Sequence, residues 1–323
     1  MSSLAAQPRV KSIDWSVVLQ RFGLALVYIV LAIALSILSD RFLTVSNQIN
    51  ILRQATINGI VAVGMTLVIL TAGIDLSVGS VLALSAVVSA DLLKQGIPVP
   101  LGILVALTIG GLMGMVNGLI ITKGRIPPFI ATLGMLTVGR GLTLMYTQGK
   151  PFTGLPAAFR FIGAGSLGPV PMPIVVAGLV FIIGGIVLSR TRFGEYVYLL
   201  GDNPLAARLA GINTHRMIIL VYMISGICAA LAGMILIARL DSAQPVIGQG
   251  YEFDAIAAVV VGGTSFSGGE GTLLGTLLGA LLIETLNNGL NLLNVSPLWE
   301  QVVKGVVIAL ALLFYKVINR SRK

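Results

Sequence analysis

The sequence has very few of the residues that build metal sites, disulfides and nucleophilic active sites. Its 323 residues include one cysteine, Cys228, and one histidine, His215. A disulfide framework, a zinc site and a Cys–His nucleophile are therefore excluded within a single chain. A Walker loop is missing too, since Gly263-Thr-Ser-Phe-Ser-Gly268 is followed by Gly269 where the phosphate-binding lysine belongs. If ATP drives this protein, another chain binds it.

Charged residues are also scarce, and apolar residues take their place. Charged side chains make up 10% of the sequence and hydrophobic ones 56%, and the mean hydropathy is +0.98. This composition is typical of a membrane protein, because a soluble core needs less apolar surface. The formal net charge of +9 would suggest nucleic acid as the partner of a soluble protein. Here the basic residues fall in short loops, where they set membrane topology, so we expect membrane lipid and no nucleic acid around this chain.

Apolar runs that approach the about 20 residues needed to cross a bilayer recur along the chain. They predict one all-α, polytopic membrane helix bundle over 22–318, with a polar tail over 1–21 and a basic tail over 319–323. About ten spans are expected, at 22–38, 56–74, 76–90, 97–121, 126–146, 172–189, 217–238, 251–262, 272–290 and 302–318. The run at 251–262 is short. Whether it crosses fully or forms a half-helix decides between ten spans and nine.

The orientation of the bundle follows from the first run and from the loops. The first run contains Ala32-Ile33-Ala34, which resembles the cleavage site of a secretory signal, but the run continues past that site and we expect an anchor. The segment 147–171 is rich in glycine and proline and is ordinary connecting loop by composition. With an inside start and ten spans, about twice as many lysines and arginines fall inside as outside. The positive-inside rule then places both termini and segment 190–216 in the cytoplasm.

The longest polar interruption of the apolar sequence is RTRFGEYVYLLGDNPLAARLAGINTHR, residues 190–216. Asp202 and Asn203 are good helix N-caps, and Pro204 stands where a first helical residue would. A short helix is predicted over 204–209, ended by Gly211. Its small residues would let a partner approach closely, although a plain surface turn of helix between two spans has the same features. These small residues are Ala206, Ala207 and Ala210.

Acidic and basic residues also occur within or between the apolar runs. The runs at 56–74 and 76–90 are joined without a polar loop, which suggests a tight helix break where Asp75 or Ser77 caps the next helix or contacts substrate. Arg140 and Glu284 lie about 21 and 18 Å from the cytoplasmic end of their spans. Similar depth permits an ion pair. Separate polar partners, snorkelling and direct substrate contact are the alternatives.

Two patterns suggest a transporter built by duplication. Asn117-Gly118-Leu119 recurs as Asn288-Gly289-Leu290 five spans later, hence in opposite orientation, as in an inverted repeat, although three matching residues also arise by chance. A neutral, hydroxyl-rich solute needs hydrogen-bonding side chains along its path, because a hydroxyl stripped of water must be paired again. The same side chains also serve as contacts between helices. The candidates are Asn58, Thr66, Asn117, Asn287, Asn288 and Asn291.

Three stretches of the chain carry a family resemblance. They are NGIVAVGMTLVILTAGIDLSVGS at 58–80, the central segment, and SAQPVIGQGYEFDAIAAVVVGGTSFSGGEG at 242–271. Together they resemble the permease subunits of bacterial ATP-binding-cassette importers for ribose and related monosaccharides, from about residue 40 to 315. The coupling motif of such permeases is Glu-Ala-Ala, then any three residues, then Gly. Here Ala206, Ala207 and Gly211 match this motif, while Leu205 replaces Glu. The resemblance implies that the ATPase is contacted by Asn203, Leu205, Ala206, Ala207, Arg208 and Gly211.

The resemblance also implies partners, location and fold. It implies a bacterial inner-membrane homodimer, a cytoplasmic ATPase that binds the ATP and Mg²⁺, and a periplasmic or lipid-anchored sugar-binding protein. The fold implied is that of the ten-helix vitamin B12 importer permease. The alternative function is a secondary carrier or channel that works alone, but Arg140, Glu284 and Lys304 are too few for its charge relay. An intramembrane enzyme lacks any catalytic set.

Overall fold

The computed structural model of the chain describes residues 15–296 together with 299, 302, 305 and 306. Most of the expected N-terminal tail, most of the last span, Lys304 and the basic tail lie outside the described residues. The described helices are α1 (Trp15–Leu38), α2 (Val45–Leu70), α3 (Val78–Lys94), α4 (Val99–Thr122), α5 (Pro128–Thr147), α6 (Ala157–Ala164), α7 (Met172–Arg190), α8 (Arg192–Asp202), α9 (Pro204–Leu209), α10 (Thr214–Leu240), α11 (Tyr251–Val261) and α12 (Leu273–Leu292). Short strands are β1 (Phe152–Thr153), β2 (Ser166–Leu167), β3 (Val170–Pro171) and β4 (Ser242–Ala243).

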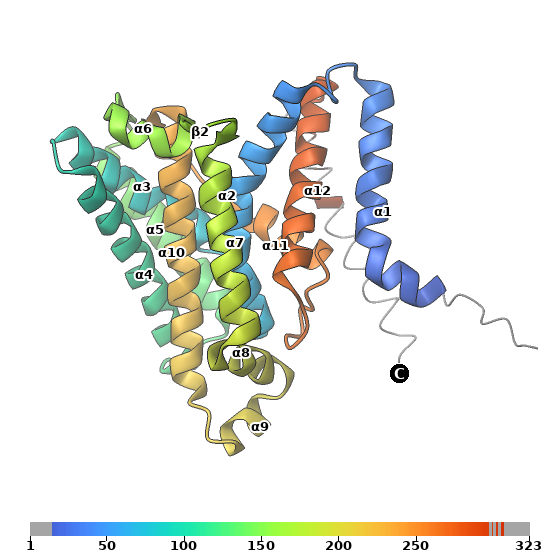
Figure 1. Ribbon diagram of the computed structural model, residues 1–323. Helices are drawn as coiled ribbons and strands as arrows, with labels where there is room; N and C mark the ends of the chain where they lie inside the picture. The colour runs from blue at the N-terminus through green and yellow to red at the C-terminus, as the bar shows by residue number, and fades with distance from the viewer. Residues whose placement is uncertain (1–14, 297–298, 300–301, 303–304, 307–323) are drawn as a thin grey trace, which may run out of the picture.

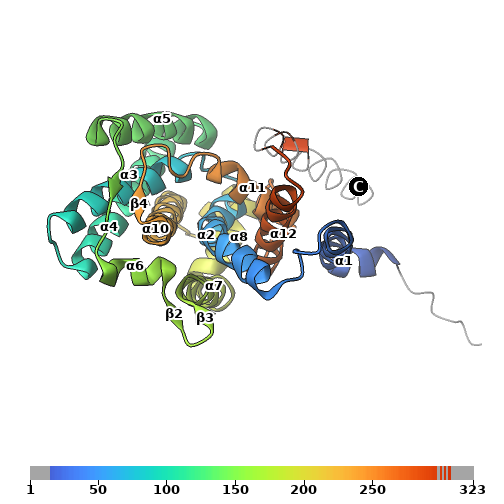
Figure 2. The same ribbon diagram turned by 90° about the horizontal axis from the view of Figure 1, so that it is seen from above.

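The described helices form the polytopic membrane bundle that composition predicts. Six of them are long and apolar enough to cross a membrane, namely α2, α4, α5, α7, α10 and α12. The most deeply embedded of these is α2, which packs against α10 (Figures 1 and 2). Seen from above, α4 and α5 lie at one edge of the bundle and α1 at the other (Figure 2). Every polar group inside must therefore find its partner within the protein.

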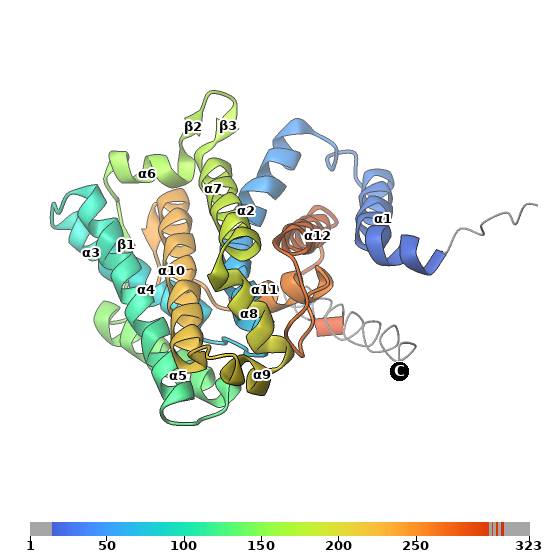
Figure 3. The same cartoon turned by 60° about the horizontal axis from the view of Figure 1, so that its bottom comes forward.

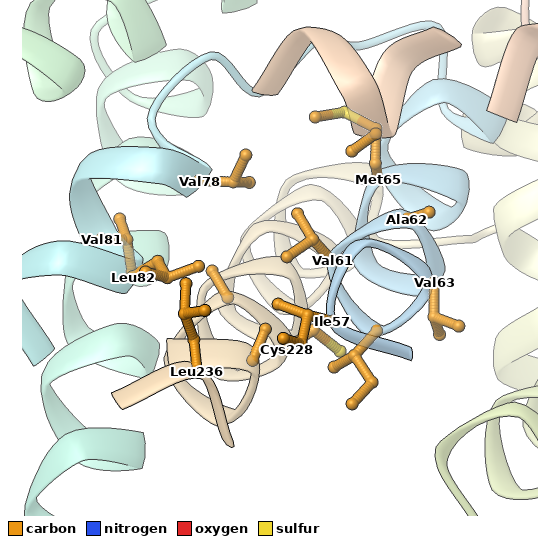
Figure 4. Packing of buried hydrophobic residues seen from close by; sticks show 14 of the residues in the cluster. Ile57, Val61, Ala62, Val63, Met65, Val78, Val81, Leu82, Cys228 and Leu236 are labelled. Carbon is orange, nitrogen blue, oxygen red and sulfur yellow. The ribbon is translucent and has the colours of Figure 1, made fainter. Parts of the chain in front are cut away.

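The centre of the bundle is a continuous apolar core. Side chains of α2, α3 and α10 meet there, among them Ile57 and Val61 of α2, Leu82 of α3, and Cys228 and Leu236 of α10 (Figure 4). The single cysteine is thus a buried packing residue. Burial of this kind fixes the three helices relative to one another and leaves their breaks as the irregular parts of the core.

Small residues bring α4 onto α10. A Cβ on Gly110 or Gly114 of α4 would collide with the backbone carbonyl of Gly226 or Tyr222 on α10. Gly226 is equally crowded by the Gly110 carbonyl. Close approach of this kind is the usual way for membrane helices to gain packing energy, because lipid gives them no hydrophobic reason to associate.

The chain between α10 and α12 crosses the bundle without one continuous span. β4 follows α10 and pairs with β1, whereas the loop before α12 lies at the other end of the bundle, where Gly269 donates to the Leu70 carbonyl over 3.0 Å. At 1.5 Å per residue, the 11 residues of α11 reach only about 16 Å. The segment predicted at 251–262 is therefore a half-helix. An irregular stretch over 241–250 completes the crossing.

Two stretches expected as loops contain helices. The segment 147–171 holds α6 and three short strands, with β2 paired to β3. Arg160 of α6 forms an ion pair with Asp241 at 3.3 Å, and the Leu155 backbone NH donates to the same carboxylate over 2.8 Å. These contacts hold α6 against the end of α10. Residues 192–202 form α8, which the charged and glycine-containing sequence did not suggest.

Candidate functional site

The predicted short helix over 204–209 is confirmed as α9, and its cap is Asn203. The Asn203 side chain accepts hydrogen bonds from the backbone NH groups of Leu205 at 3.1 Å and Ala206 at 3.0 Å. Asp202, the other predicted cap, is instead the last residue of α8. The helix ends as expected at Gly211, which has φ of +81° and is followed by an Ile212 NH donating to the Ala207 carbonyl over 3.1 Å. Local sequence alone thus specifies this element.

One face of α9 is held by the protein and the other is free. Ala207 is 3% exposed, and the Arg208 guanidinium donates through Nε to the Thr214 hydroxyl over 3.2 Å, which ties α9 to the start of α10. Leu205 is 66% exposed and Leu209 is 82% exposed. Four residues apart on a helix, the two leucines share a face. Of the predicted contact residues, all except Ala207 are exposed, and Leu209, which the motif does not include, is more exposed than Leu205.

Helix α8 links α9 rigidly to the membrane helices. Gly201 lies so close to the Leu70 carbonyl, at the end of α2, that any side chain there would collide with it. The Tyr198 hydroxyl donates to the Gly271 carbonyl, just before α12, over 2.8 Å, and burial raises the pKa of this phenol. Through these contacts, α8 connects α9 to the ends of α2 and α12. Figure 3 shows α8 and α9 together at this end of the bundle.

The break between α2 and α3 is organised by a buried carboxylate. Asp75 is 1% exposed and accepts from the Ser77 backbone NH at 3.0 Å, the Ser77 hydroxyl at 2.6 Å and the Ser225 hydroxyl of α10 at 2.9 Å. The N-cap position of α3 is held by Ser77, whose side chain makes no cap bond, and Asp75 instead fixes the turn before the helix. The Ser77 hydroxyl also accepts from Asn117 of α4 over 2.8 Å. The carboxylate thus bonds directly to Ser77 and to α10, and is linked to α4 through Ser77.

The irregular stretch before α11 is held by Arg140 of α5. Its guanidinium donates to the carbonyl of Pro245 over 3.0 Å and to that of Ile247 over 2.9 Å. Beside these carbonyls, a Cβ on Gly79 would collide with the Gly248 carbonyl and with the carboxylate of Glu252. The two breaks therefore meet inside the bundle, each entering from an opposite end. Close approach at this point depends on glycine on both sides.

The predicted pair of Arg140 with Glu284 is wrong for the described structure, in which each has other partners. Glu284 accepts from Asn58 of α2 over 3.1 Å and from Asn287 over 3.5 Å. The acid whose charge acts on Arg140 is Glu252, which is 6% exposed in the first turn of α11. Sequence reasoning missed Glu252, since hydropathy gives no sign that α11 starts inside the bundle.

Polar side chains predicted along a path mostly join helices. Between α2 and α12, Asn288 exchanges two hydrogen bonds with Asn47, both at 2.9 Å, and Thr66 pairs with Thr276 at 2.8 Å. Asn58 and Asn287 bond to Glu284, Asn117 to Ser77, and all of these groups are buried. Only Asn291 among the six candidates is exposed, with its amide donating to the Asn287 carbonyl over 2.9 Å. The arrangement favours the interhelical interpretation.

Comparison with known proteins gives a consistent relationship. A family model described as branched-chain amino acid transport system / permease component matches residues 47–312. The ribose import permease protein RbsC of Bacillus subtilis (strain 168) is 49% identical over 97% of this chain and 98% of that protein. RbsC of Escherichia coli (strain K12) is 50% identical over 88% and 90%. The D-allose transport system permease protein AlsC of Escherichia coli (strain K12) is 37% identical over 90% of each chain. No solved structure matches.

Proposed function

Because the chain belongs to the family described as branched-chain amino acid transport system / permease component, we propose that it is the permease of an ATP-binding-cassette importer for ribose. Identity of 49% and 50% to ribose permeases, against 37% to the D-allose permease, supports ribose over other sugars. The substrate would be a neutral monosaccharide, although the family description refers to amino acids. The chain is a transport component and not an enzyme.

The proposed architecture is a ten-helix inverted repeat similar to the vitamin B12 importer permease. The packing of the described helices supports the repeat, since α4 packs on α10 as α12 packs on α2. Each half also has an irregular break after its central helix, at 71–77 and at 241–250. With α11 as a half-helix, the tenth helix would be formed by residues that lie largely outside the described part of the chain. Breaks entering from opposite ends are what an inverted repeat requires.

The observation that carries the proposal is the free face of α9. Two exposed leucines on a capped helix, fixed to the ends of α2 and α12, suit a groove on a partner that delivers force. We infer that this partner is the ATPase, which binds the ATP and Mg²⁺, and that segment 190–216 is the coupling loop. Apolar contact through Leu205 would replace the acidic contact that other permeases make there.

The remaining partners follow from the two ends of the bundle. We place α8, α9 and both termini on the cytoplasmic side of the inner membrane. We place α6 and the β2–β3 hairpin on its outer side. A periplasmic or lipid-anchored sugar-binding protein would dock on that outer face, where the ion pair of Arg160 with Asp241 braces α6. A second copy of the chain would complete the sugar path. Within one chain, five of the six polar candidates bond to other side chains, while the side-chain carbonyls of Asn58, Asn117 and Asn287 have no partner among the described residues.

The test compares two exposed apolar faces at opposite ends of the molecule. Leu205→Ser with Leu209→Ser should lower ribose-stimulated ATP hydrolysis and ribose uptake by about tenfold, the loss typical of removing central interface anchors. Leu167→Ser changes a leucine with 64% exposure on β2, on the face proposed for the binding protein, so it should leave copurification of the ATPase with the permease intact, whereas the double variant should reduce it. The assay uses proteoliposomes containing the permease, the ATPase and the binding protein.

Two results would contradict the proposal. Unchanged hydrolysis and uptake in the double variant would show that α9 is not the ATPase contact. Uptake of another monosaccharide in preference to ribose, with coupling intact, would reject the substrate and keep the transporter class.

A further inference from the structure

A cavity of about 400 Å³ lies where α7, α8 and the start of α12 meet. Its size falls within the about 300–1,000 Å³ typical of sites for small organic ligands. It is separate from both breaks and from the exposed face of α9. One wall is the last three turns of α7, and the opposite wall is Leu273 and Leu274, with Tyr198 of α8 at the end. Part of the lining is therefore membrane-spanning helix.

The lining changes in character along the axis of α7. Phe181 and Ile182, at the middle of α7, line one end of the cavity, and Leu274 lines it from α12. Nine residues further along α7, about 13 Å at 1.5 Å per residue, Arg190 lines the end of the cavity. Tyr198 and Thr272 are polar groups near it. The cavity thus has apolar side chains at one end and the Arg190 guanidinium at the other. Such a lining is complementary to an amphipathic ligand that carries a negative charge.

A glycine keeps the cavity open. A Cβ on Gly184 would meet Leu273 at 3.1 Å and Val63 at 3.2 Å, so that side of α7 is packed. A Cβ on Gly185, which lines the cavity, would meet nothing within 4 Å. A larger side chain at Gly185 would thus enter the cavity without displacing the protein's own atoms.

We propose that this cavity is a binding site for an anionic phospholipid, with an acyl chain against Phe181 and Leu274 and the headgroup phosphate on Arg190. Bilayer lipid surrounds a helix such as α7 on its open side and is available to fill the groove. Basic pockets between membrane helices near the interface are suited to anionic headgroups. The site goes beyond sugar transport and does not depend on which solute is carried.

The test uses native mass spectrometry of the full-length protein in detergent, with phosphatidylglycerol and phosphatidylcholine added in equal amounts. The protein should retain phosphatidylglycerol about fivefold more, the factor that one basic residue contributes near an anionic surface. Gly185→Trp should lose the bound lipid, whereas Gly178→Trp, at a glycine of α7 that also has open space but does not line the cavity, should keep it. Arg190→Gln should lose the headgroup preference, and Arg192→Gln should keep it.

A second filling variant guards against misfolding of the first. If Gly185→Trp does not fold, Leu274→Trp blocks the cavity from the α12 wall and should also lose the lipid. The proposal would be overturned if Gly185→Trp and Leu274→Trp retained the lipid, or if Gly178→Trp lost it equally. It would also be overturned if Arg190→Gln kept the preference for phosphatidylglycerol over phosphatidylcholine. Displacement by glycerol phosphate, which has no acyl chain, would do so too, because it would show a simple anion site.

Discussion

At the scale of single residues, Arg140 shows how a membrane bundle stabilises a charge within a span. A lone charge at the centre of a bilayer costs at least about 2.5 kcal/mol. Arg140 offsets this cost by donating to two carbonyls of the irregular stretch before α11, at 3.0 and 2.9 Å, near the carboxylate of Glu252. These carbonyls have no helical partner, so the guanidinium stabilises a backbone that would otherwise be unsatisfied.

We expect Arg140 to be coupled energetically to Glu252 and not to Glu284. Combining Arg140→Gln with Glu252→Gln should give a coupling energy between about 0.5 and 3 kcal/mol, as for residues joined through a shared segment, because Arg140 bonds to two carbonyls shortly before Glu252. With Glu284→Gln, the losses should add to within about 0.5 kcal/mol, because Glu284 bonds to Asn58 and Asn287 instead. The free energy of unfolding in detergent is the measurement. If Arg140 were coupled to Glu284 and not to Glu252, the result would support the pair of Arg140 with Glu284 that the sequence suggested.

At the scale of elements, α9 depends on one backbone conformation at its end. Gly211 has φ of +81°, and a Cβ there would meet nothing within 4 Å. The Cβ of a larger residue at this position therefore meets no atom of the described chain. The cost of a substitution at Gly211 comes from the left-handed backbone conformation. Glycine adopts this conformation without strain, asparagine adopts it with little strain, and other residues are strained.

Substitutions at Gly211 should rank by backbone preference and not by size. Gly211→Val should destabilise the end of α9 by about 1–2 kcal/mol and lower ATPase coupling, because β-branched residues resist positive φ. Gly211→Asn, with a side chain of similar volume, should retain most activity. Ribose-stimulated ATP hydrolysis measures both, and hydrogen exchange over 204–212 reports the helix itself. Equal loss in the two variants would favour a steric or contact role.

At the scale of the whole molecule, the ends of the bundle are distinguished by what lies on them. One end carries α8 and α9, and the other carries α6 and the β2–β3 hairpin (Figure 1). From the charge pattern of the loops, we propose that the first end is cytoplasmic. The single cysteine, Cys228, is buried at 8% exposure and gives little background to thiol labelling.

Labelling of introduced cysteines tests this orientation. Cysteine at Asn213, before α10, should react with an impermeant thiol reagent only from the cytoplasmic side. Cysteine at Thr153, in β1, should react only from outside, because an odd number of crossings separates the two positions. Inside-out and right-side-out vesicles give the two measurements. The reverse pattern at either site would overturn the proposed topology.

The sequence by itself determined the features that depend on neighbouring residues. Apolar runs predicted the membrane class and most helices, because hydropathy and helix length are local properties. Asn203, Pro204 and Gly211 predicted α9 within its observed bounds, and the helix break at Asp75 and Ser77 was also predicted, because such signals act within a few residues. Glycine and proline in 147–171 hid α6, which is stabilised by a distant partner, Asp241.

Only the tertiary structure decided which distant groups meet. Arg140 lies 105 and 107 positions from the carbonyls it binds, and Asn58 lies 226 positions from Glu284. Similar depth in a membrane allowed a pair of Arg140 with Glu284, but depth does not fix the rotation of a helix or its neighbours. Tertiary packing also determines which face of α9 is exposed and where the cavity beside Gly185 lies. Packing decides these features because each depends on several helices at once.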